Sequence, residues 1–84
     1  MAKFQVKAML LAPSDEGYTC VTDPKAYGDF KILETAYKYN NLDVMELVLN
    51  NYRYDNGAVE EHKSDAKTII EYSGDGFCLL ERVS

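Results

Sequence analysis

Residues Asp29–Tyr52 (DFKILETAYKYNNLDVMELVLNNY) decide the fold of this chain. Apolar residues recur at helical spacing in both halves of the stretch. They are Phe30, Leu33, Ala36 and Tyr37 in the first half, and Leu42, Met45, Val48, Leu49 and Tyr52 in the second. Asn41 stands between the halves, where its amide oxygen can accept a free backbone N–H of the next helix. Asp23-Pro24 offers a capping residue followed by proline, which favours a helix start. The stretch predicts a helical hairpin.

Strands are expected on both sides of this hairpin. Lys3–Ala12 alternates between two faces, and its second half has apolar residues on both. The residues expected on one face are Phe4, Val6, Ala8 and Leu10. Pro13–Gly17 has the composition of a turn, and Tyr18–Thr22 is rich in aromatic and β-branched residues, which predicts an N-terminal β-hairpin. Phe77–Val83 has apolar residues on both faces at its start, as in a central strand.

These elements predict a single compact α+β domain over residues 1–84. Its small antiparallel sheet consists of the N-terminal hairpin plus the C-terminal strand, and it packs with two or three helices. The chain is long enough to fold alone but too short for a separate lobe that would enclose a deep catalytic cleft.

Two segments admit two structures each. Asp55–Gly57 is the strongest turn signal, and it either ends the second helix through a left-handed glycine or joins Tyr52–Tyr54 to Ala58–Glu60 in a β-hairpin. The long stripe from Leu42 favours helix termination. Ser64 caps a third helix that Gly74 ends, although Thr68–Tyr72 also suits a strand because it contains β-branched residues.

The charge is unevenly distributed along the chain. The net charge is −5, and residues 40–84 carry the whole excess, with nine acidic residues against Arg53, Lys63, Lys67 and Arg82. Phosphate binding requires clustered cations, so direct nucleic-acid binding is not expected. A protein partner with a basic surface suits this half better.

The side chains that usually carry catalysis are scarce. His62 lies in the charged run Glu60–Lys63, and we interpret it as part of a solvated loop or helix face. One histidine without a close cysteine pair does not predict a metal site, and no cofactor is expected. Cys20 and Cys78 are interpreted as buried thiols, and Ser73–Gly76 as a turn. We therefore do not expect this protein to be an enzyme.

The composition also indicates a cellular compartment. Two cysteines are too few for a disulfide framework, which suits a reducing environment. No apolar run approaches the length of a membrane span, and the first residues lack the pattern of a secretory signal. A cytoplasmic protein without membrane contact is therefore expected.

Tyrosine is the most abundant aromatic residue, with seven in 84 positions. Tyrosine and arginine are enriched where proteins bind one another, because they combine a large apolar body with a polar or charged tip. We expect partner-binding residues in this aromatic stretch and in the acidic segment after it. They are Tyr37, Tyr39, Tyr52, Arg53, Tyr54, Glu60 and Glu61. If the helices pack antiparallel, the first two tyrosines lie at the opposite end from the others.

These features favour a small acidic, non-catalytic module that binds a larger protein. In general character, rather than in particular residues, the chain resembles accessory proteins of bacteriophages, including inhibitors of host defence systems or nucleases. The second hypothesis is a protein that binds or sequesters a small ligand such as a nucleotide. Tyrosines would stack on its base, Arg53, Lys38 or Lys31 would meet its phosphate, and a homo-oligomer would build the pocket between subunits.

Overall fold

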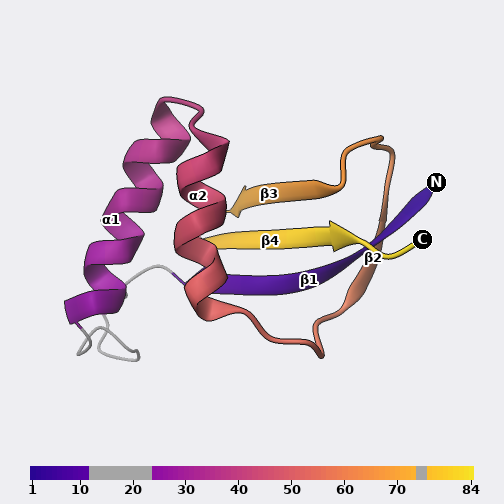
Figure 1. Cartoon of the computed structure of the whole chain (residues 1–84), viewed down its shortest axis with the longest axis horizontal. Coiled ribbons are helices and arrows are strands. Elements are labelled where there is room, and N and C mark those ends of the chain that lie inside the picture. Colours follow the sequence, from indigo (N-terminus) through magenta and orange to yellow (C-terminus); the bar gives the residue numbers. More distant parts are fainter. Residues whose placement is uncertain (12–23, 74–75) are drawn as a thin grey trace.

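The computed structural model describes residues 1–11, 24–73 and 76–84, and these form an antiparallel sheet and two α-helices (Figure 1). In chain order the elements are β1 (Ala2–Leu11), α1 (Pro24–Lys38), α2 (Leu42–Leu49), a 3-10 turn (Asn50–Tyr52), β2 (Val59–His62), β3 (Thr68–Ser73) and β4 (Gly76–Arg82). The predicted α+β class is confirmed. Tyr18–Thr22, the expected hairpin partner of β1, lies outside the described residues.

The described strands pair in the order β2-β1-β4-β3, with every pair antiparallel. β4 is therefore a central strand, as Phe77–Val83 predicted. The chain ends meet at the end of the sheet away from the helices, where Lys3 N–H donates to the Ser84 carbonyl (Figure 1).

A bulge in β1 changes which face its side chains occupy. Val6 pairs with Leu80, whereas Ala8 pairs with Leu79, so Lys7 is an extra residue in the ladder. Leu79 and Leu80 are neighbours on one strand and point to opposite faces. The expectation that Phe4, Val6, Ala8 and Leu10 share a face is wrong for this reason. Met9 and Leu11 are exposed, so the second half of β1 is buried on one side only.

The helical hairpin forms as the sequence predicted. α1 begins at Pro24, and the Asn41 side chain caps α2 by accepting a hydrogen bond from Val44 N–H at 3.3 Å. Between the helices Asn40 adopts a left-handed conformation (φ 57°), which asparagine tolerates better than most residues. Leu42 is an exception to the predicted stripe, because its side chain is exposed at the start of α2.

The described residues form two buried clusters on opposite faces of the sheet. The larger one, here the hairpin core, lies between the helices and one face. It consists of Ala8, Leu10, Phe30, Leu33, Ala36, Met45, Val48, Leu49, Phe77 and Leu79. The smaller one, here the sheet core, consists of Phe4, Val6 and Leu80, with Tyr54, Ile69 and Cys78 packed against it. Cys78 is only partly buried, so the expectation of a buried thiol is wrong in degree.

Asp55–Gly57 ends the helical part of the chain, but not through a left-handed glycine. The 3-10 turn stops at Tyr52, and Arg53 is already extended and bridged to Ala8. Gly57 has no positive φ and is needed for a different reason, since a Cβ there would lie 2.0 Å from the Val6 carbonyl oxygen. The alternative hairpin is also absent, because β2 pairs with β1 instead.

Of the two structures left open for Thr68–Tyr72, the strand is the one that forms. Thr68–Ser73 forms β3, in which threonine and two isoleucines suit a pleated, half-buried surface better than a helix. The Ser64 hydroxyl accepts a hydrogen bond from Ala66 N–H, so it closes a local turn before the strand. β3 and β4 pair with Ser73 opposite Gly76, and the residues between them, in the predicted turn, lie outside the described ranges. His62 belongs to β2 and not to a loop or helix.

Candidate functional site

The segment Tyr52–Tyr54 connects the helices to the sheet core. The Tyr52 hydroxyl donates a hydrogen bond of 2.6 Å to Asp29 Oδ2 on α1, and this bond is the main reason why the pKa of Asp29 is lowered. Tyr54 packs against the sheet core, and burial raises the pKa of its hydroxyl. Both rings are half-buried, so most of their apolar surface serves the fold.

Arg53 is held by its own chain. Its guanidinium donates to both carboxylate oxygens of Glu81, at 3.0 and 2.7 Å, and to Asn50 Oδ1 at 2.9 Å. This bidentate pair lowers the pKa of Glu81 and raises that of Arg53. A partner or a phosphate would have to compete with Glu81 for the guanidinium. Binding roles for Tyr52, Arg53 and Tyr54 stay predictions.

Tyr37 and Tyr39 lie at the far end of the hairpin from Tyr52, as the antiparallel arrangement predicted. Tyr37 packs on Tyr72 and Phe77, with ring centroids 5.0 and 5.9 Å away, which leaves half of its side chain exposed. Tyr39 is 72% exposed, with the Lys38 ammonium 5.8 Å from its ring centroid. Tyr39 is thus the predicted tyrosine most available to a partner.

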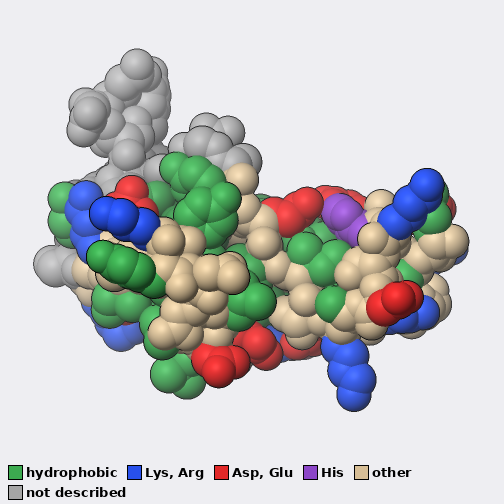
Figure 2. All heavy atoms as spheres, turned by 90° about the horizontal axis from the view of Figure 1, so that it is seen from above, with side chains coloured by type: hydrophobic (Ala, Val, Ile, Leu, Met, Phe, Trp, Pro, Cys, Tyr) green, Lys and Arg blue, Asp and Glu red, His purple; other side chains and the backbone are tan. Residues whose placement is uncertain are grey.

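A hollow of about 450 Å³ lies between the two helices. Its lining comes from α1, α2 and the turn between them: Lys31, Ile32, Thr35, Ala36, Tyr39, Asn41 and Val44. Leu42 and Leu47 are also exposed on α2, Leu47 at 70%. Figure 2 shows exposed hydrophobic side chains, in green, over this helical end of the molecule. We call Ile32, Tyr39, Leu42, Val44 and Leu47 the outer hairpin face.

The charges beside the outer hairpin face differ between the helices. α2 (LDVMELVL) carries two acidic residues and no basic one, and Asp43 stands one turn before Leu47 on the same side of the helix. On α1 the Lys31 ammonium lies 3.4 Å from Glu34 Oε1, and this neighbouring charge is the main cause of its raised pKa. The apolar surface is therefore acidic along α2 and nearly balanced along α1.

Glu60 and Glu61, the predicted acidic binding residues, lie on opposite faces of β2. Glu61 pairs with Lys3 in the ladder and is exposed. Glu60 instead faces the sheet core, and its carboxylate lies 3.0 Å from His62 Nε2. Glu71 from β3 joins them, so that three groups able to hold a metal ion lie within 4.8 Å of one another.

The sequence analysis did not identify the central residues of the outer hairpin face or of the cluster around His62. Ile32 and Leu47 are apolar but lie off the predicted helical stripes, and that misfit is the signal that would have identified an exposed face. The sequence left helix and strand open for the segment that contains Glu71, and the strand β3 turns this residue toward Glu60 and His62.

No family model, curated protein or solved structure gives a significant match to this chain. In the described part of the chain, neither helix has the length and apolar character needed to cross a membrane.

Proposed function

We propose that this chain is a non-catalytic binding module that docks on a larger protein through the outer hairpin face. The observation that carries the proposal is the exposure of Ile32 and Tyr39, which line a hollow between the helices, together with that of Leu47 on α2. Exposed aromatic and aliphatic side chains beside a concave apolar surface are typical of protein interfaces. An apolar side chain of the partner would enter the hollow, and the exposed apolar side chains around it would exclude water from the contact.

The chemistry of the partner follows from α2. Asp43 and Glu46 stand beside the apolar residues without a basic residue on the same helix. A partner surface with lysine or arginine around an apolar anchor would complement this arrangement and associate faster at low ionic strength. The net charge of −5 acts in the same direction.

The finer form of the proposal is inhibition or modulation of a host protein, such as a nuclease or a defence system, in the cytoplasm. Proteins that act on nucleic acids have basic surfaces, and a small acidic module blocks such a surface simply by covering it. This role needs affinity rather than catalysis.

Capture from an extract of the native cell tests the proposal with matched variants. The test variant is Tyr39→Ser with Leu47→Ser, which removes apolar surface from the outer hairpin face without touching a buried residue. The control is Val59→Ser with Val83→Ser, which removes exposed apolar surface from the sheet end. We expect one larger protein to be retained by the wild type and the control and to be lost from the test variant.

The purified partner then allows a quantitative measurement. Removing two apolar anchors should weaken binding about 10-fold to 100-fold, and Asp43→Asn should mainly slow association and reduce its dependence on salt. Equal retention of every protein by the test and control variants contradicts the proposed surface. The proposed function is contradicted if the wild type, the test variant and the control variant all fail to retain a specific protein.

A small ligand is the second candidate, because the same hollow combines an aromatic ring with a cation. Tyr39 and Lys31 both line it, as stacking on a base and contact with a phosphate would require. Thermal unfolding in the presence of individual nucleotides tests this alternative. A stabilisation by one nucleotide that Tyr39→Ser abolishes would place it ahead of protein docking.

A further inference from the structure

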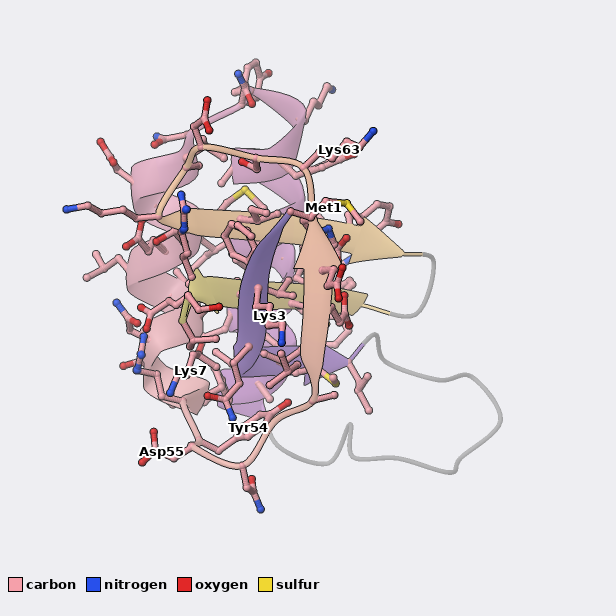
Figure 3. The ribbon with its side chains drawn as sticks, turned by 90° about the vertical axis from the view of Figure 1, so that its right-hand side faces the viewer. Met1, Lys3, Lys7, Tyr54, Asp55 and Lys63 are labelled. Atoms are coloured by element: carbon pink, nitrogen blue, oxygen red, sulfur yellow. The ribbon has the colours of Figure 1, made fainter. Side chains whose placement is uncertain are left out.

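The two edge strands of the sheet meet over its second face, although two other strands separate them. β2 and β3 are the outer members of the order β2-β1-β4-β3. β2 pairs only with the first part of β1, before the bulge at Lys7, and a bulge increases the local bend and twist of a strand. β2 runs antiparallel beside the first part of β1, and in Figure 3 these two segments stand across β3 and β4. This curl brings side chains of β2 to side chains of β3.

Three side chains meet there with ligating atoms directed at one place. Glu60 and His62 are two residues apart on β2 and so share a face of the strand. Together with Glu71 from β3 they place a ring nitrogen and two carboxylates within 4.8 Å of one another. Figure 2 shows the single histidine, in purple, beside carboxylates in red. Each edge of the sheet thus contributes to one cluster.

The side chains beneath the cluster are apolar and mostly buried. The fully buried Phe4 meets the His62 ring edge to face, with centroids 5.6 Å apart and planes at 86°. Leu80 and Cys78 belong to the same surface. Glu60 lies opposite Phe4 in the ladder between β1 and β2, and Glu71 lies opposite Cys78 in the ladder between β3 and β4, so both carboxylates are on this face. The cluster therefore lies over the sheet core.

Two carboxylates at this separation repel each other unless a cation lies between them. Within the described residues, no lysine or arginine forms a salt bridge with Glu60 or Glu71, and the interaction found is the one between Glu60 and His62. A bound cation would neutralise both carboxylates and replace the hydrogen bond to the imidazole. The cluster has the charge for a divalent ion.

We propose that Glu60, His62 and Glu71 bind a divalent transition-metal ion of the zinc class. One imidazole nitrogen and two carboxylate oxygens suit zinc, with water as the fourth ligand, whereas magnesium prefers oxygen ligands alone. Zinc bonds of about 2.0–2.2 Å in a tetrahedron place ligand atoms roughly 3.4 Å apart. The longest separation in the cluster, at most 4.8 Å, closes by small rotations of the exposed glutamates.

The ion would join the two edges of the sheet. Because Glu71 lies nine residues after His62 on the opposite edge, a metal bond from each strand closes the curl over Phe4 and Leu80. Binding to the folded chain alone would stabilise it by mass action. The sequence-based expectation of no metal site rested on the lack of a second histidine and of a close cysteine pair. A site made of one histidine and two carboxylates needs neither.

Calorimetric titration of the tag-free, metal-free chain with zinc chloride tests the proposal. We expect one ion per chain, a higher unfolding midpoint with zinc, and no binding of magnesium chloride at the same concentration. His62→Gln and Glu71→Gln should each weaken zinc binding about 10-fold or more. Glu61→Gln is the matched control, since it removes the same charge from β2 on the opposite face, and it should keep the wild-type affinity.

The two cysteines need a separate control because thiolates bind zinc strongly. Cys20→Ser with Cys78→Ser should bind zinc as the wild type does, since Cys78 is not in the three-residue group. Loss of binding in this variant, unchanged binding in His62→Gln, or equal losses in Glu71→Gln and Glu61→Gln would overturn the proposal. Circular dichroism without metal shows whether each variant is folded. If His62→Gln is unfolded, Glu60→Gln replaces it and should show the same loss.

Discussion

The helical end and the sheet end of this molecule are stabilised in different ways. The hairpin core contains ten buried residues, most of them on two helices whose turns and caps are encoded locally. The sheet core contains three, and it exists only because a bulge in β1 sends Phe4 and Val6 to the face opposite Ala8 and Leu10. Local periodicity determines the first end, whereas long-range register determines the second.

The same difference separates the two proposed sites. The outer hairpin face consists of side chains on two neighbouring helices, and we propose that it docks a protein. The metal cluster needs side chains from β2 and β3, which are neighbours only in the curled sheet. Changes at one end should therefore leave binding at the other end intact.

The largest expected effect comes from two adjacent leucines that enter different cores. Leu79 and Leu80 are both fully buried, Leu79 in the hairpin core and Leu80 in the sheet core. Leu79→Ala should lower the free energy of unfolding by about 2–5 kcal/mol, the usual range for a truncated core leucine. Leu80→Ala should lie near the lower limit, because the smaller core can collapse around the cavity. Chemical denaturation measures both.

A single unfolding transition is expected in both variants, since β1 and β4 pass through both cores. Hydrogen exchange should then show weaker protection at both ends. A larger cost for Leu80→Ala than for Leu79→Ala would contradict this comparison, because it would make the sheet core the main source of stability.

The helical end was predictable from the sequence because its signals are local. Pro24 at the helix start, Asn41 as a cap and the buried stripe residues Leu33 and Met45 all occupy the expected roles. The sheet end was not, since alternation does not reveal a bulge at Lys7. The β-branched run in β3 competed with a plausible cap at Ser64, and tertiary pairing with β4 decided the outcome.

The candidate sites were predictable only in part. The sequence pointed to Tyr39 and Glu60, but it also selected Arg53, whose guanidinium is paired with Glu81. Periodicity assigns residues to faces but says nothing about intramolecular ion pairs. The cluster of Glu60 with Glu71 could not be predicted from the sequence, because it depends on how far the sheet curls.

Alanine substitutions at two glycines are expected to change the stability of the protein in opposite directions. A Cβ at Gly57 would lie 2.0 Å from the Val6 carbonyl oxygen and 2.9 Å from its carbonyl carbon, both backbone atoms of β1. Gly57→Ala should destabilise the protein by about 1–3 kcal/mol, because the chain must move away from the strand. At Gly28, inside α1, no described atom apart from its chain neighbours and the nearby backbone of its own helix lies within 4 Å of the added carbon. Gly28→Ala should stabilise by about 0.5–1 kcal/mol through helix propensity.

Thermal and denaturant unfolding of both variants measures these changes. Gly57→Ala should also weaken zinc binding, since Val6 N–H donates to the Ala58 carbonyl where the chain enters β2. Stabilities that change in the same direction would show that the contact with β1 does not fix the start of the curl.

A small, pH-dependent effect is expected at the link between Tyr52 and Asp29, which connects the junction to α1. The hydrogen bond from Tyr52 lowers the pKa of Asp29 below its ordinary 3.8, so the folded state is stabilised above that pH. This contribution is lost as the pH falls through the lowered value, because the carboxylate becomes protonated. Tyr52→Phe should therefore cost about 1 kcal/mol at neutral pH and less below pH 3.8.

Denaturant unfolding of wild type and Tyr52→Phe between neutral and acidic pH measures this difference. Tyr54→Phe is the matched control, because within the described ranges no hydrogen bond joins the Tyr54 hydroxyl to a carboxylate. Its effect should not depend on pH in this range. A cost of Tyr52→Phe that is equally independent of pH would mean that ring packing against the hairpin core, rather than the bond to Asp29, holds the junction to the helices.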